Sequence, residues 1–148
     1  MKKRIDYVRN FVKNINNDFE VYESDTFEAD VTQEEVYITF LDDKESQEVY
    51  LKFLKQEFGK NFNPFVISLL HEIGHIKTND EEMLEDRDLV YGLLKLDFYN
   101  GTSSIEEYNN MYFRIPAEYA ATEWAVNYYN NHIEECENLA KKIFSIDF

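Results

Sequence analysis

Two of the three histidines in this chain stand four residues apart, with an acid directly after the first. They belong to the segment HEIGH, residues 71 to 75. Residues four apart share one face of a helix, so the imidazoles of His71 and His75 can reach a single cation. Glu72 is turned about 100° from His71, where its carboxylate can reach a water on that cation instead of the cation itself. The pattern predicts a metal site in which Glu72 acts as a general base.

The residues around this segment predict a mostly buried helix. Apolar side chains recur on both sides of the polar ones: Val66, Ile67, Leu69, Leu70, Ile73 and Ile76. Unpaired polar groups are costly to bury, so two histidines and a glutamate on such a helix need partners. A bound metal satisfies all three. We favour it over the alternative that HEIGH is a coincidence in a plain helical interaction domain.

A catalytic zinc site uses three protein ligands and leaves a fourth position open. Two residues are candidates for the third ligand, Glu118 and His132. Small residues let two helices approach closely, as a metal shared between helices requires. Glu118 shares its helix face with such residues at offsets of three, four and seven, namely Ala121, Thr122 and Ala125. The sequence therefore favours Glu118 over His132.

Hydrophobic spacing predicts the elements that must position these residues. An amphipathic helix is expected near 4–16. Segments 19–24, 26–31 and 35–41 are rich in β-branched and aromatic residues, which predicts a small antiparallel sheet of about three strands. Helical patterns follow over 42–58, 64–78, 81–99, 105–114, 117–130 and 132–145. The sequence thus predicts one α+β domain over residues 1–148: a first helix, a small sheet, and a helical bundle that carries HEIGH.

Capping residues support several of these boundaries. Asn63 is placed to cap the helix that starts at Pro64, where a proline has no helical hydrogen bond to lose. Ser104 is placed to cap a later helix in the same way. Gly59 stands where a glycine that ends a helix is expected.

The charge of the chain limits its partners. Its 148 residues carry a formal net charge of −15, and the pI is about 4.5. Such a surface repels phosphate backbones, which argues against direct nucleic-acid binding, and it attracts basic proteins. Alternatively, the acids serve only to keep the domain soluble.

Several features together predict a cytoplasmic protein. Cys136 is the only cysteine, so no disulfide within the chain is possible, and this fits a reducing compartment. The basic first residues lead into no apolar signal segment. The longest apolar stretch, FVISLL, is too short to cross a membrane.

Two motifs resemble those of the ImmA/IrrE family of zinc metallopeptidases. One is HEIGH, and the other runs from Glu118 to Ala125, with Ala121, Thr122 and Trp124 between them. The family pattern has Asn where this chain has Thr122, and the segment between the two motifs is longer here. The resemblance covers roughly residues 30 to 128.

The resemblance implies a zincin-like domain in which His71, His75 and Glu118 hold Zn²⁺ and Glu72 is the general base. It implies a peptidase that cleaves a protein substrate, such as a DNA-binding repressor of a phage, another mobile element or a stress response. A basic repressor would suit the acidic surface. The alternative is a non-catalytic or toxin-like module that uses the same zinc fold to bind a protein partner.

Peptide hydrolysis needs further parts that the sequence leaves open. A donor to the developing oxyanion is expected. Three tyrosines near the Glu118 helix are equal candidates, although a structural role is favoured for each: Tyr108, Tyr112 and Tyr119. The strand at 36–41 precedes the metal helix. We expect it to form an exposed edge, to which an extended substrate adds as a further strand.

Overall fold

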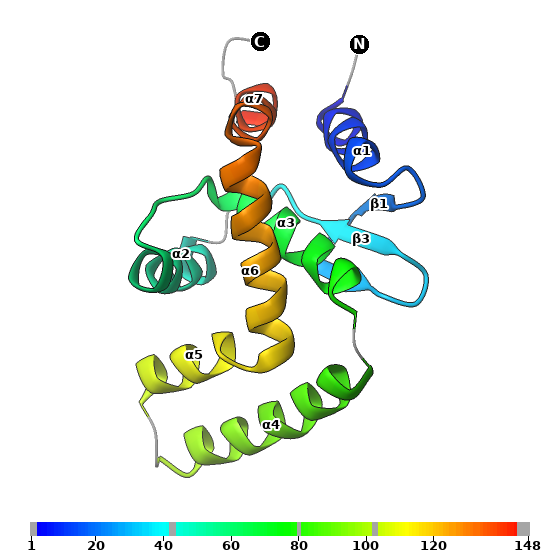
Figure 1. Ribbon diagram of the computed structural model, residues 1–148. Helices are drawn as coiled ribbons and strands as arrows, with labels where there is room; N and C mark the ends of the chain where they lie inside the picture. Colours follow the sequence, from blue (N-terminus) through cyan, green and yellow to red (C-terminus); the bar gives the residue numbers. More distant parts are fainter. Residues whose placement is uncertain (1–2, 42–43, 80, 102–103, 145–148) are drawn as a thin grey trace.

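Helix α3 (Pro64–Lys77), which carries HEIGH, lies at the centre of the structure (Figure 1). The computed structural model describes residues 3–41, 44–79, 81–101 and 104–144. Pro64 occupies the first turn of α3, and the Asn63 side chain accepts a hydrogen bond from the Val66 backbone N–H at 3.1 Å. The predicted cap is confirmed. The apolar side chains of the helix are buried: Phe65, Val66, Ile67, Leu69, Leu70 and Ile73.

Six further helices and three strands make up the rest of the described chain. They are α1 (Arg4–Ile15), β1 (Glu20–Glu23), β2 (Glu28–Asp30), β3 (Glu35–Ile38), α2 (Lys44–Phe58), α4 (Glu81–Tyr99), α5 (Ile105–Phe113), α6 (Pro116–Asn131) and α7 (Ile133–Phe144). This confirms the α+β class, and the helices agree with those predicted to within one or two residues. Positions 42, 43 and 145 of the predicted helices lie outside the described residues.

Two other predicted caps are also confirmed. Gly59 follows α2 with a φ of +69°, a left-handed conformation that glycine adopts without strain. The Ser104 hydroxyl accepts a hydrogen bond from the Glu107 backbone N–H at 3.1 Å at the start of α5. Both helix ends therefore follow from local sequence.

The sheet is mixed, so the predicted antiparallel arrangement is wrong. Its order is β1-β3-β2, with β3 antiparallel to β2 but parallel to β1. Val36 of β3 pairs with Val21 on one side and with Ala29 on the other. The reason lies in burial: β3 buries Val36 and Ile38 completely, whereas β1 buries one residue and β2 none. The most buried strand takes the central position, where both of its edges find hydrogen-bond partners.

The prediction that the strand at 36–41 forms an exposed edge is also wrong. β3 ends at Ile38 and has a neighbour on each side. The edges belong to β1 and β2, and β2 contacts α3. An extended peptide that adds to the sheet beside α3 would therefore have to add to β2.

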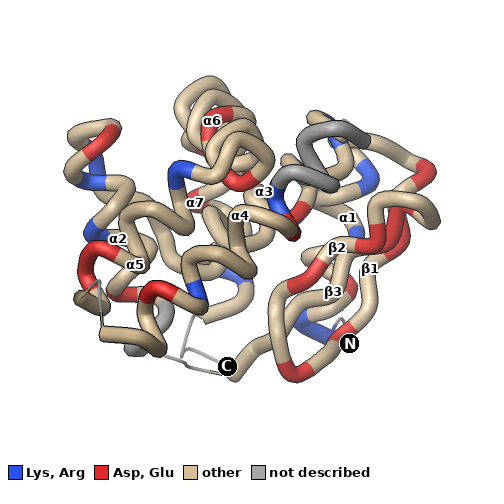
Figure 2. The backbone as a smooth tube through the Cα atoms, turned by 90° about the horizontal axis from the view of Figure 1, so that it is seen from below, with Lys and Arg blue, Asp and Glu red and all other residues tan. Residues whose placement is uncertain are grey.

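Helices α4 and α5 form a hairpin on the side of the molecule away from both termini (Figure 1). Tyr91 and Phe98 of α4 pack on Tyr112 and Tyr108 of α5, with ring centroids 5.5 and 5.4 Å apart. Viewed from this side, acidic positions recur along the three strands (Figure 2). None of the helices in the described ranges combines the length and apolarity needed to cross a membrane.

Candidate metal centre

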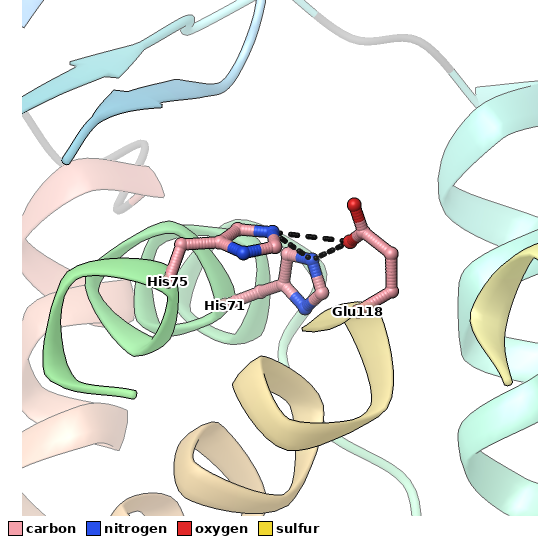
Figure 3. A group of neighbouring side chains, drawn as sticks. All are labelled: His71, His75 and Glu118. Carbon is pink, nitrogen blue, oxygen red and sulfur yellow. Dashed lines mark hydrogen bonds and ion pairs between the residues drawn. The ribbon is translucent and has the colours of Figure 1, made fainter. Parts of the chain in front are cut away.

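His71, His75 and Glu118 meet at one point between α3 and α6 (Figure 3). Glu118 Oε2 lies 2.9 Å from His71 Nε2 and 3.0 Å from His75 Nε2, and the two nitrogens are 3.1 Å apart. The side chains of His71, His75 and Glu118 are only 14%, 8% and 4% exposed, respectively. Three ligand atoms of types that bind metals thus converge in a nearly buried position.

The close approach of α3 and α6 depends on small residues from both helices. Gly74 lies directly against Ala121, and a Cβ on Gly74 would stand 2.5 Å from the Ala121 carbonyl oxygen. Ala121, Thr122 and Ala125 are fully buried. The predicted small-residue face beside Glu118 therefore does pack against another helix. Sequence reasoning missed that Gly74, inside HEIGH itself, is the other half of this contact.

The convergence of the three atoms fits a metal ion. Tetrahedral zinc sites have bonds of about 2.0–2.2 Å, which separates ligand atoms by about 3.3–3.5 Å. The distances here, 2.9, 3.0 and 3.1 Å, are only a few tenths of an ångström shorter, so small side-chain rotations would admit the ion. His71, His75 and Glu118 form a group that could bind a metal ion.

The pKa shifts show that positive charge is favoured at this point. Burial would lower the pKa of His71, but its hydrogen bond to Glu118 and the charges of Glu72 and Glu118 outweigh burial and raise it. Burial would raise the pKa of Glu118, but hydrogen bonds from His71 and His75 hold it well below the usual range. The negative charges of Glu72 and Glu118 that favour a proton on the His71 imidazole also favour a metal cation. The proton and the metal cation therefore compete for the site.

A second set of side chains holds the outer nitrogen of His71. Thr122 Oγ1 lies 3.0 Å and the Tyr50 hydroxyl 3.1 Å from His71 Nδ1, and the two oxygens are 3.1 Å apart. When Nδ1 carries the proton, Nε2 is free to bind a metal. Thr122 therefore has a polar partner in the site. Tyr50 comes from α2, 21 positions before His71, and no local sequence signal pointed to it.

The other oxygen of Glu118 is also held. The Tyr112 hydroxyl donates to Glu118 Oε1 at 3.3 Å, and Arg87 Nη1 lies 3.9 Å from the same oxygen. Glu118 thus turns Oε2 to the histidines and Oε1 to α4 and α5. The sequence marks Tyr112 as one of three equal candidates and does not single out Arg87.

Glu72 stands apart from the three converging atoms but faces the same cavity. It is buried, and its Oε2 has no hydrogen-bond partner among the described residues. Burial raises the pKa of its carboxyl, with the charges of His71 and His75 opposing the shift. A buried carboxylate without a partner is costly. Glu72 as a whole lines the cavity, so a small rotation of its carboxylate would bring this buried oxygen to a molecule bound there.

The cavity over the site has a volume of about 430 Å³. Edge strand β2 and the residues around it form one wall, and α4 and α5 form another. The lining residues outside the metal site include Phe27, Glu28, Ala29, Arg87, Tyr112 and Phe113. The site therefore opens between the sheet edge and the helical hairpin.

The remaining candidates lie elsewhere. His132 ends α6, where its ring stacks on Tyr128 at 3.9 Å and its Nδ1 lies 2.9 Å from the Tyr128 carbonyl oxygen. Tyr119 donates to Glu57 at 2.9 Å, and Tyr108 packs on Phe98. The structure brings Glu118, not His132, to the two histidines. Of the three tyrosines, only Tyr112 lines the cavity.

Comparisons with protein-family models, with curated proteins and with solved structures find no match to this chain. The likeness to ImmA/IrrE peptidases rests on the two motifs alone.

Proposed function

We propose that this protein is a zinc-dependent metallopeptidase that hydrolyses a peptide bond in a protein substrate. One observation carries the proposal: His71, His75 and Glu118 converge at the floor of an open cavity, and the unpartnered Glu72 carboxylate faces the same space. Two imidazoles and one carboxylate favour zinc over harder cations such as magnesium or calcium. When bound, the cation would activate a water molecule and polarise the scissile carbonyl.

Glu72 supplies the proton transfers. Glu72 lines the cavity and one of its oxygens has no protein partner, so its carboxylate can accept a proton from the attacking water and pass it to the leaving amine. Burial raises the pKa of this carboxyl, which makes it a stronger base than a solvated glutamate. Glu72 is not one of the residues that hold the metal, so catalysis and metal binding can be separated by mutation of Glu72.

Tyr112 is the best candidate for the oxyanion donor. Tyr112 lines the cavity, and burial, with the negative charges of Glu118 and Glu72, raises the pKa of its hydroxyl. The phenol therefore keeps its proton and can donate a hydrogen bond to charge that develops on the substrate. Its present partner, Glu118 Oε1 at 3.3 Å, is weak enough to exchange for a substrate oxygen.

The substrate lies along β2 in this proposal. β2 is an edge strand that borders the cavity, so an extended peptide could add to it and cross the metal site. The net charge of −15 suits a basic protein. A DNA-binding repressor in the cytoplasm, as the ImmA/IrrE resemblance implies, has that character.

The test separates metal binding from catalysis. Elemental analysis should find about one zinc per chain in the wild type and in Glu72→Gln, and clearly less in Glu118→Ala. Glu72→Gln should nevertheless lose cleavage of a basic model protein such as a histone. Glu123→Ala, at an exposed position on the same helix as Glu118, is the matched control and should keep both properties.

Three results would count against the proposal. Unchanged zinc in Glu118→Ala would remove Glu118 from the ligand set. Zinc in the wild type without any cleavage would favour the non-catalytic binding module. No zinc in any variant, even after zinc is supplied, would make HEIGH a packing feature.

A further inference from the structure

The mechanism leaves Arg87 of α4 without a role. It is the one lysine or arginine among the described residues that line the cavity, whose acidic lining residues are Glu28, Glu72 and Glu118. Its side chain is 33% exposed. A single cation beside three acids, at the edge of the metal site, calls for a functional explanation.

The guanidinium is held along one edge and open at its end. Asp88 Oδ1 lies 3.4 Å from Nε and 3.3 Å from Nη2 of Arg87. Nη1 faces Glu118 Oε1 at 3.9 Å, which is too long for a hydrogen bond. A guanidinium has five N–H donors. The end formed by Nη1 and Nη2 thus keeps donors that no described side chain accepts.

We propose that Arg87 binds a carboxylate of the peptide substrate, close to the bond that is cut; this rests on the proposed peptidase function. Two parallel N–H donors match the two oxygens of a carboxylate. Arg87 lies next to the ligand Glu118, and an extended chain advances about 3.3–3.6 Å per residue. The carboxylate therefore belongs to a residue one or two positions from the scissile bond.

Two sources can supply this carboxylate. One is the α-carboxylate at the C-terminus of the substrate, in which case the protein removes one or two terminal residues. The other is the side chain of an Asp or Glu within the substrate. The acids around the cavity repel a carboxylate at other positions, so Arg87 selects where the negative charge lies.

Binding of short peptides tests the inference without turnover. The probes are acetylated alanine-rich peptides that differ by one Glu or Gln at successive positions, each made with a free or an amidated C-terminus. Their affinities are measured by calorimetry on the full chain carrying Glu72→Gln, loaded with zinc. A peptide with a correctly placed carboxylate should bind about tenfold or more tightly than its neutral twin.

Arg87→Gln in the same background should remove this difference and leave the affinity of the neutral twin unchanged. Arg114→Gln is the control, because Arg114 pairs with Glu57 at 2.7 Å away from the cavity lining. A preference that depends on the free C-terminus identifies the terminal carboxylate as the source. A preference that depends on Glu identifies the side chain.

Four results would overturn the inference: no peptide binds, both twins bind alike, the preference survives Arg87→Gln, or Arg87→Gln loses zinc as Glu118→Ala does. The last result would make Arg87 a residue that positions the metal ligand. The peptidase proposal is judged separately, on zinc content and on cleavage of the basic model protein by the wild-type chain. A protein that binds zinc and cleaves without any carboxylate preference would refute only the role of Arg87.

Discussion

The α3–α6 pair and the α4–α5 hairpin both contribute to the site, but they are built differently. Gly74 and Ala121 bring α3 and α6 into backbone contact, and the shared face is fully buried. In contrast, α5 has no buried residue, and the hairpin leaves large apolar side chains exposed: Leu89, Leu93, Leu96, Tyr99, Ile105 and Met111. The three candidate metal ligands stand on the tightly packed pair, whereas Arg87 and Tyr112 stand on the hairpin.

This difference separates two requirements of a catalytic site. Metal ligands must be held within a few tenths of an ångström, and packed helices meet that demand better than loosely packed ones. Residues that contact a substrate gain from elements that open at a lower free energy. We therefore expect the same substitution to change stability or metal affinity more in the α3–α6 pair than in the α4–α5 hairpin.

Gly74→Ala should give the largest effect. The new Cβ would meet the Ala121 carbonyl oxygen at 2.5 Å, so the two helices must move apart. Overpacking of this kind destabilises proteins by about 1–3 kcal/mol. We expect a loss near the upper end of this range, because neither the new Cβ nor the Ala121 carbonyl oxygen can rotate away from the other. Urea denaturation measures the change. A variant as stable as the wild type would show that α3 and α6 are not tightly packed.

Local patterns predicted the features that depend on neighbours in sequence. The four-residue spacing of His71 and His75, the Asn63 cap and the left-handed Gly59 each follow from a few adjacent residues. The small face beside Glu118 is a longer-range inference, but it too depends on the residues of one helix. These parts of the site and fold therefore follow from residue types and their spacing along the chain.

Features that depend on contacts between distant segments were not predictable. The order β1-β3-β2 depends on which strand is most buried in the assembled core, because strand propensity alone does not choose neighbours. Tyr50 and Arg87 reach the site from helices whose local sequence gives no hint of a role. Each is one polar residue on a helix, and only the packing of that helix brings it to a ligand.

The hydrogen bonds around the ligands sharpen the comparison. Thr122→Val removes the hydroxyl 3.0 Å from His71 Nδ1, and losing such a partner lowers metal affinity by about 10- to 100-fold. Thr122→Ser should restore most of the affinity. Tyr112→Phe removes a longer bond of 3.3 Å, from the hairpin to Glu118, and should weaken zinc binding less. Competition with a fluorescent zinc chelator measures the zinc affinity of all three variants. A larger loss of affinity for Tyr112→Phe than for Thr122→Val would mean that the α4–α5 hairpin supports the candidate ligands more strongly than the α3–α6 pair does.

Gly92→Ala, the same chemical change as Gly74→Ala, should have the smallest effect and the opposite sign. Gly92 lies inside α4, it is exposed, and a Cβ there would meet no atom within 4 Å. Alanine is favoured over glycine in a helix interior by about 0.5–1 kcal/mol, because the unfolded chain loses conformational freedom. The free energy of unfolding should therefore rise by about this amount, or by less if the hairpin opens before the rest of the chain unfolds. Urea denaturation followed by far-UV circular dichroism measures the change, and hydrogen exchange at α4 amides shows where the gain appears. A loss of stability would mean that this face of α4 is covered, and the contrast between the two glycines would then disappear.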